Sequence, residues 1–286
     1  MIPVSLYHFY LLKQLNFSLK LNFLNTFYFQ KVSDYLKIGY FSPLKIHSSM
    51  MRSKIYAALS IPLFAILYID TAIVVLTLLI FAWLHWKGPI RVISQLWAKS
   101  VFFIIGRKIH LLGKENINRS EKYILVANHS SLFDIMAIMS FYPGVSWFGH
   151  ERLLKVPLFG KILMMTNYVP FRKPTFANTK IMMEQLVVKS DNSTVAIFPE
   201  GTRTTNGEIN DFYKGFIYLF RSTNTAILPV TLNGFYSLKP KTRFYINLNS
   251  KLDVVIHKPI RSEELIGKTD DEIIETVKNV IELAYK

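Results

Sequence analysis

A histidine and an aspartate follow a short apolar segment near the middle of the chain. Residues 123–127 have the composition of a buried strand, and they lead directly into Asn128, His129 and then Asp134. If a helix begins near Ser131, Asp134 lies in its first turn, and a reversal of the chain brings the carboxylate beside the imidazole. A carboxylate bonded to one ring nitrogen fixes the tautomer and leaves the other nitrogen as a base. Such a pair can take a proton from an alcohol.

Asp134 also has a purely structural interpretation. Ser131 followed three residues later by Asp134 resembles a capping box, and an acidic residue in the first turn complements the helix dipole. A single histidine in a loop, such as His129, is also usually structural. This motif alone therefore leaves both interpretations open.

A second polar segment follows another apolar stretch, residues 194–198. It contains Glu200, Gly201, Thr202 and Arg203. Glycine permits close approach of the backbone, and the planar guanidinium of arginine suits a phosphate group. The alternative is a solvated turn with an incidental ion pair. Because ligands bind at the carboxyl ends of strands in open α/β sheets, we expect both polar segments at the same edge.

Short apolar runs that alternate with helix-like stretches must position these side chains. We predict strands at residues 109–112, 123–127, 145–148, 194–198 and 226–232, and helices at 131–141, 175–189 and 211–222. A β-rich stretch from Arg243 to Ile256 and an amphipathic helix from Ser262 to Ala284 follow. Strands alternating with helices predict an α/β fold with a mostly parallel central sheet flanked by helices.

A long apolar run precedes this region. Residues 57–86 contain one formal charge, Asp70, and exceed the roughly 20 residues needed to cross a bilayer. Two geometries fit, a single tilted spanning helix or two shorter helices that turn near Asp70; a buried core helix is the alternative. Residues 90–105 are consistent with an amphipathic helix at the membrane interface or a cap on the next domain.

The first fifty residues show neither clear periodicity nor the organisation of a signal peptide. We expect residues 1–50 to be a poorly structured extension and residues 51–105 to hold membrane-anchoring helices. Met50 and Met51 stand just before the apolar run, and our hypothesis is that the working protein begins there. The intact mass of the natively expressed protein tests this hypothesis.

Composition narrows the classes of partner. The formal charge of +15 predicts a polyanionic partner, and 51% hydrophobic residues with 22 Phe and 15 Tyr favour an anionic membrane over nucleic acid. With no cysteine, disulfides and thiolate chemistry are excluded. No Gly-x-Ser-x-Gly motif is present, which argues against a serine esterase.

Together these segments resemble the glycerolipid acyltransferases, in particular the 1-acylglycerol-3-phosphate acyltransferases, over roughly residues 90–235. Four blocks carry the resemblance in the family's order: Asn128-His129 with Asp134, Phe171-Arg172, Glu200-Gly201-Thr202-Arg203, and Leu228-Pro229-Val230. The chain departs from the family's usual pattern in having Leu228 where valine is common. The resemblance implies that residues 106–286 form the acyltransferase domain.

The resemblance also implies roles for individual residues. His129 would be the general base and Asp134 would orient it. Substrate binding would fall to Phe171, Arg172, Glu200, Gly201, Thr202, Arg203 and Pro229, with Arg172 on the acceptor phosphate and Pro229 on the acyl-donor side. The acceptor would be a lysophospholipid, with acyl-coenzyme A or acyl carrier protein as co-substrate and no metal or other cofactor.

Two competing functions stay open. One is transfer to another lysolipid, such as a lyso-aminolipid; the presence of both Arg172 and Arg203 argues instead for a phosphate. The other is a basic membrane-binding module in which His129 is only structural. For the enzyme, we expect a membrane location with the active site facing the cytoplasm, because both acyl donors are cytoplasmic.

Overall fold

The computed structural model describes residues 51–155, 168–171, 182, 184–188 and 193–286. Residues Tyr56–Lys286 form one compact unit, and Met1–Ile55 form another, of which only the beginning of a helix is described. The predicted extension at residues 1–50, and with it the expected start at Met50, therefore lies outside the described residues.

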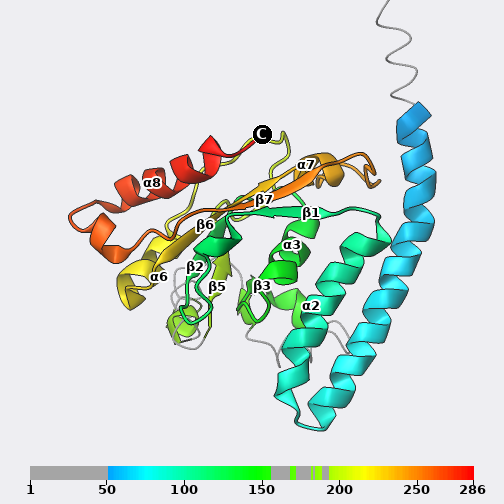
Figure 1. Cartoon of the computed structure of the whole chain (residues 1–286), viewed down its shortest axis with the longest axis horizontal. Helices are drawn as coiled ribbons and strands as arrows, with labels where there is room; N and C mark the ends of the chain where they lie inside the picture. Colours follow the sequence, from blue (N-terminus) through cyan, green and yellow to red (C-terminus); the bar gives the residue numbers. More distant parts are fainter. Residues whose placement is uncertain (1–50, 156–167, 172–181, 183, 189–192) are drawn as a thin grey trace, which may run out of the picture. The chain divides into compact units, whose positions relative to one another are not determined.

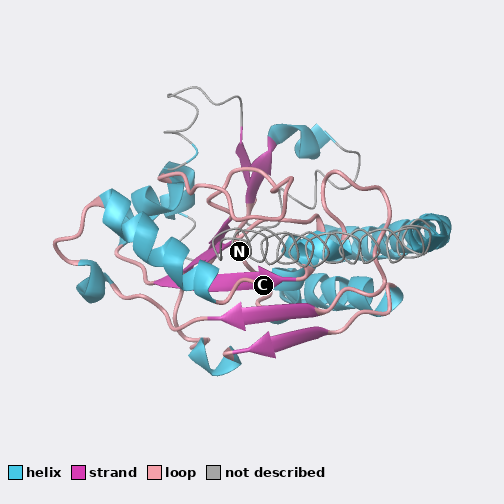
Figure 2. Ribbon diagram, turned by 90° about the horizontal axis from the view of Figure 1, so that it is seen from above, coloured by secondary structure: helices cyan, strands magenta, loops and turns pink. Residues whose placement is uncertain are grey.

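A mixed five-stranded sheet forms the centre of the α/β region (Figure 1). Its strands are β1 (Ile109–Leu112), β2 (Ile124–Ala127), β5 (Val195–Ile197), β6 (Ile227–Asn233) and β7 (Leu252–Ile256). Their order is β1-β7-β6-β2-β5, and every neighbouring pair is parallel except β6 and β7. This confirms the predicted α/β fold with a mostly parallel sheet. Figure 2 shows these strands side by side, with helices beside them.

Helices and two further short strands complete the described part. After the N-terminal helix Met51–Trp83 come the α-helices α2 (Lys87–Ile104), α3 (Phe133–Phe141), α6 (Gly215–Thr223), α7 (Phe235–Leu238) and α8 (Asp270–Leu283). Three short 3-10 helices cover Lys114–Asn116, Glu151–Lys155 and Ser262–Leu265. The strands β3 (Phe148–His150) and β4 (Val169–Phe171) pair with each other in parallel.

Alternate side chains of the central strands divide the hydrophobic core into two layers. Leu125 and Ala127 of β2 lie in a cluster with α2 and α3, whereas Ile124 and Val126 lie in a cluster with α6 and α8. This period-two alternation is what a strand covered by helices on both faces requires. Both layers bury large side chains, each of which stabilises the fold by about 1.5–3 kcal/mol.

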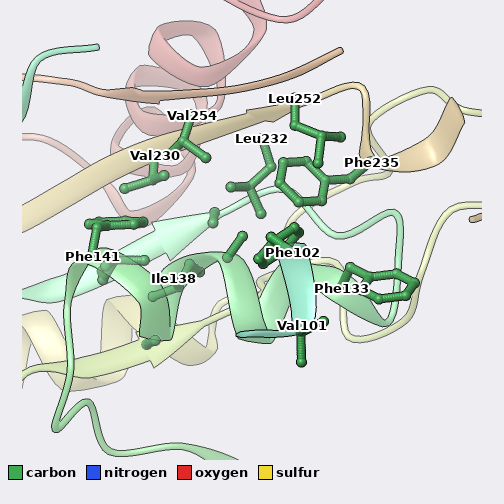
Figure 3. Packing of buried hydrophobic residues seen from close by; sticks show 14 of the residues in the cluster. Val101, Phe102, Phe133, Ile138, Phe141, Val230, Leu232, Phe235, Leu252 and Val254 are labelled. Atoms are coloured by element: carbon green, nitrogen blue, oxygen red, sulfur yellow. The ribbon is translucent and has the colours of Figure 1, made fainter. Parts of the chain in front are cut away.

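Aromatic rings join α2, α3 and the start of α7 in the first layer (Figure 3). The ring of Phe102 lies 6.2 Å from that of Phe133 and 6.3 Å, edge to face, from that of Phe235. Because Phe133 is the first residue of α3, this packing fixes the start of the helix that carries Asp134. The predicted helix at residues 90–105 therefore covers the α/β core.

The long apolar run forms one helix, Met51–Trp83, followed by a turn into α2. The predicted alternative of a turn near Asp70 is wrong: the helix continues through Asp70, and the reversal lies at His85, whose φ is +56°. Asp70 accepts a hydrogen bond of 2.8 Å from the Ser100 hydroxyl of α2. Only 6% of the most apolar window is buried, so this is not a core helix.

Several predicted boundaries differ from the observed ones. The strand expected at residues 145–148 is not observed with those bounds. Ser146 makes only an isolated bridge to Val195, and the strand β3 begins at Phe148. Within Arg243–Ile256, only β7 is a strand; the guanidinium of Arg243 donates to nearby backbone carbonyls and holds the preceding segment in turns. The expected C-terminal helix is interrupted at Gly267, whose φ is +79°.

Candidate active site

The imidazole of His129 is held by the carboxylate of Asp134 immediately after β2. The Nδ1 atom of His129 lies 2.8 Å from Oδ2 of Asp134. The same oxygen accepts the backbone N–H groups of Ser130 and Ser131, each at 2.7 Å. Asp134 is the second residue of α3, and helical side chains point back toward the N-terminus, so its carboxylate reaches the loop that precedes the helix.

Both interpretations of Asp134 therefore describe one arrangement. The carboxylate satisfies backbone donors at the beginning of α3, and it also orients His129. Because an ionised carboxylate only accepts hydrogen bonds, Nδ1 of His129 carries the proton and Nε2 of the neutral ring has a free lone pair. Asp134 is fully buried, whereas the His129 side chain is 16% exposed. The ring can therefore meet a substrate while its partner stays out of water.

An aromatic surface lies beneath the imidazole. The ring of Phe198 stacks on that of His129, with centroids 4.0 Å apart and planes within 13°. The ring of Trp147 in turn stacks on that of Phe198, with centroids 5.7 Å apart. These rings fix the plane of the imidazole that Asp134 orients. Phe198 was not among the predicted site residues. Only its position between β5 and Glu200 could have indicated that it lies at the site.

Glu200 holds the backbone of the same loop. Its Oε1 accepts the backbone N–H of His129 at 2.6 Å, and its Oε2 accepts the backbone and side-chain N–H groups of Asn210 at 2.9 and 2.8 Å. Burial raises the pKa of Glu200, while the hydrogen bonds from Asn210 and His129 oppose that shift. The carboxylate thus acts as a brace between two loops.

The rest of this segment runs along the other side of His129. Gly201 turns the chain with φ +65°, and the backbone N–H of Thr204 donates to the His129 carbonyl at 2.9 Å. Thr202 is exposed and Arg203 is half-buried. The structure therefore brings the first and third predicted segments together at the carboxyl ends of the adjacent strands β2 and β5, where the sequence analysis expected them.

The remaining predicted site residues are placed differently. Phe171 ends β4, opposite His150 of β3, and Arg172 lies outside the described residues. Pro229 is buried within β6, opposite Val126. Its carbonyl accepts the His257 N–H at 3.0 Å, one residue beyond the end of β7, so the missing N–H of the proline falls where this ladder ends. The binding roles of these three residues stay predictions.

Asn128 has a clear role that the sequence analysis did not assign. Its side-chain Nδ2 donates to the Leu232 carbonyl at 3.1 Å, and its Oδ1 accepts the Leu232 N–H at 2.7 Å. The amide thereby extends the pairing of β2 with β6 by one residue and fixes the point from which the His129 loop departs. In the described ranges, no group of three or more His, Cys, Asp or Glu side chains could hold a metal ion.

Known proteins share this sequence region and this fold. Residues 108–233 match the Acyltransferase family model. A 1-acyl-sn-glycerol-3-phosphate acyltransferase of Cocos nucifera is 30% identical over 65% of this chain and 58% of its own length. One of Borreliella burgdorferi is 26% identical over 64% of this chain and 76% of its own length. A chloroplastic one of Arabidopsis thaliana is 27% identical, and the chain spans only 53% of its length.

A solved structure has the same fold. The crystal structure of the 1-acyl-sn-glycerophosphate (LPA) acyltransferase PlsC from Thermotoga maritima aligns with a TM-score of 0.70 at 24% identity. The alignment covers 80% of this chain and 95% of that one. The residues that match the Acyltransferase family model include both His129 and the Glu200 segment.

Proposed function

We propose that the chain transfers a fatty acyl group from acyl-coenzyme A or acyl carrier protein to the free hydroxyl of 1-acylglycerol-3-phosphate, which gives phosphatidic acid. The observation that carries this proposal is the His129–Asp134 pair: its Nδ1 is held at 2.8 Å by a buried carboxylate, and the imidazole is partly exposed. The family match and the names of the similar proteins support the choice of reaction and acceptor.

The pair would act in two proton transfers. Nε2 of His129 takes the proton of the acceptor hydroxyl while its oxygen attacks the thioester carbonyl carbon of the donor. The carbon–sulfur bond then breaks, the new ester forms, and the departing thiolate takes the proton from His129. The carboxylate of Asp134 stabilises the imidazolium that exists between the two transfers. No covalent acyl-enzyme is needed, and the protein ends in its starting protonation state.

The acceptor's phosphate requires cations near this base. Arg203 is half-buried, follows the turn at Gly201, and forms no ion pair in the part of the chain that the structure describes. A free guanidinium two residues after that turn suits a phosphomonoester. Arg172 is proposed as a second cation, on the resemblance of its segment to the family.

The apolar helix Met51–Trp83 would hold the enzyme on the membrane. It is long and apolar enough to cross a bilayer, and many of its large side chains are exposed, among them Ile61, Tyr68 and Trp83. The formal charge of +15 would favour an anionic membrane surface over nucleic acid, given this apolar helix. We place the active site on the cytoplasmic side, where the proposed donors are, and propose that no metal or other cofactor takes part.

Acyl transfer in membranes that contain the full chain tests this function. Labelled acyl-coenzyme A and acyl carrier protein are offered with lysophosphatidic acid, to wild type, His129→Ala and His110→Ala. His110 is a matched control because it also pairs with an aspartate, Asp253, at 3.1 Å, but on the exposed edge strand β1. We expect phosphatidic acid from wild type and His110→Ala, and a loss of at least about 100-fold in His129→Ala.

Other outcomes would redirect the assignment. Product from a lyso-aminolipid but not from lysophosphatidic acid would change the acceptor and keep the chemistry. Equal product from wild type and His129→Ala would rule out His129 as the base. No transfer by folded wild type to any lysolipid would favour a basic membrane-binding module.

A further inference from the structure

The segment that follows α7 borders the His129 loop at Ser131. The Ser131 hydroxyl donates to the Lys239 carbonyl at 2.8 Å, and Ser131 forms an antiparallel bridge with Pro240. The Lys239 N–H in turn donates to the carbonyl of Phe235, which ties the segment to α7. Lys239 is therefore fixed beside the catalytic loop, although it lies 110 positions from His129 in the sequence.

Positive charge is concentrated at this place. Lys239 is half-buried, and both Arg203 and Arg243 lie close enough that their charges act on it. Burial lowers the pKa of Lys239 first, and the charges of Arg203 and then Arg243 lower it further. In the described ranges, none of these three side chains forms an ion pair with an acid. Half-buried cations without a counterion are unfavourable unless an anion joins them.

The three cations are not equally available. The guanidinium of Arg243 donates to the carbonyls of Ser237, Leu238 and Tyr245 and lies over the Tyr245 ring, so it is committed to holding the segment. Among the described residues, the ammonium of Lys239 donates one hydrogen bond, to the Arg243 carbonyl at 2.9 Å. An ammonium has three N–H groups, so two are free for a ligand. The guanidinium of Arg203 forms no ion pair with any acid in the described part of the chain.

We propose that Lys239 joins Arg203 in binding the phosphomonoester of the acceptor, and that the two cations form a phosphate-binding subsite beside His129. The two cations come from segments that are each hydrogen-bonded to the His129 loop, through Ser131 and through the His129 carbonyl, so a phosphate bound by both would hold the acceptor beside the imidazole. The inference rests on the proposed function for the identity of its ligand, but the cluster itself is independent of the reaction. A doubly charged phosphate satisfies both cations, and an acceptor without phosphate leaves them unpaired.

Steady-state kinetics of the full chain in membranes test the subsite. The variants are Lys239→Gln, Lys239→Arg and the matched control Lys241→Gln, which removes an exposed lysine two positions along the same segment. In Lys239→Gln, we expect the KM for lysophosphatidic acid to rise at least about tenfold, with kcat nearly unchanged, because a binding contact is lost. Lys239→Arg should restore most of the affinity, and Lys241→Gln should match wild type.

Two further arms identify the source of the phosphate. Monoacylglycerol, the same acceptor without its phosphate, should have an equal KM with wild type and Lys239→Gln. Acyl-coenzyme A also carries phosphates, so its KM is measured at saturating acceptor. A rise confined to the donor KM would overturn the assignment to the acceptor, and no change in either KM would overturn the subsite.

A measurement without catalysis separates this proposal from the proposed function. Glycerol 3-phosphate should raise the melting temperature of the detergent-solubilised wild type and of Lys241→Gln, and should not raise that of Lys239→Gln. If wild type transfers no acyl group but this difference appears, the subsite stands and the proposed function fails. If glycerol 3-phosphate stabilises all three equally, Lys239 does not bind it. Unliganded melting temperatures show whether Lys239→Gln is folded.

Discussion

Replacing Asp134 with asparagine separates its role at the helix start from its proposed role in catalysis. One carboxylate oxygen, Oδ2, accepts three N–H groups, whereas Oδ1 is buried and has no hydrogen-bond partner among the residues that the structure describes. The asparagine oxygen must take the place of Oδ2, because an NH2 group there would face the backbone N–H groups of Ser130 and Ser131. The amide nitrogen then takes the place of Oδ1. The geometry around His129 survives, and the negative charge does not.

The expected loss of stability follows from these contacts. The buried NH2 group has no acceptor, which costs about 1–3 kcal/mol. The three remaining hydrogen bonds lose the charge on their acceptor, but the fold no longer has to desolvate a carboxylate, so these two effects oppose each other. We expect the free energy of unfolding to fall by about 1–3 kcal/mol, which lowers the melting temperature by about 3–10 °C.

The expected loss of activity is larger and has a different cause. Without the carboxylate of Asp134, the imidazolium of His129 is not stabilised, and we expect kcat to fall about 100- to 10,000-fold. Instability cannot produce this. A domain with about 5 kcal/mol of stability that loses 3 kcal/mol is still more than about 95% folded.

Acyl transfer and thermal melting are measured on wild type, Asp134→Asn, His129→Ala and the double variant. If Asp134 acts through His129, the double variant should be no slower than His129→Ala alone. The reasoning is refuted if Asp134→Asn keeps more than about a tenth of the wild-type kcat while its melting temperature falls. It is also refuted if Asp134→Asn slows the His129→Ala protein by the factor seen in wild type.

Three further predictions concern the elements around the site. Burial lowers the pKa of His257, so the unfolded chain binds a proton more readily than the folded chain, and stability present above about pH 6.5 is lost as the pH falls. The melting temperature of His257→Gln should therefore depend less on pH between about 7.5 and 5.5 than that of wild type. An equal pH dependence of the two proteins would contradict this. Gly234→Ala should lower the free energy of unfolding by more than about 2 kcal/mol in chemical denaturation, because φ of Gly234 is +83° and a Cβ there would clash with the backbone carbonyl oxygen of Lys251. Gly88→Ala is the control and should be neutral, because a Cβ at Gly88 meets no described atom within 4 Å. Asp70→Cys combined with Ser100→Cys should form an intramolecular disulfide on oxidation, because the two native side chains meet at 2.8 Å and the chain has no native cysteine. The disulfide is detected as a gel shift that is absent from either single variant. The absence of a crosslink would contradict this approach of the two helices.

The sequence predicted the position of the site because two local patterns agree. Residues 123–127 and 194–198 are apolar runs that each end in a polar segment, and parallel neighbours must present such ends at one edge. The pairing of β2 with β5 and the bond from His129 to Glu200 follow that expectation. The position of the chain reversal after the apolar run was not predictable in the same way. Asp70 is the only charge there and suggested a break, but Ser100 satisfies it across the hairpin.

Contacts that join distant segments set the limit of sequence reasoning at this site. Glu200 is expected to face a substrate if only its polar motif is considered, yet both of its oxygens hold backbone or amide N–H groups. Lys239 lies outside every motif and resembles an ordinary surface lysine until the Ser131–Pro240 bridge places it beside His129. The negative charge of Glu200 holds these N–H groups and would repel a phosphate, whereas a cation without a counterion, such as Lys239, attracts one. We therefore propose that Arg203 and Lys239 supply the charge that selects a phosphorylated acceptor, while Glu200 holds the loop that carries the proposed base, His129.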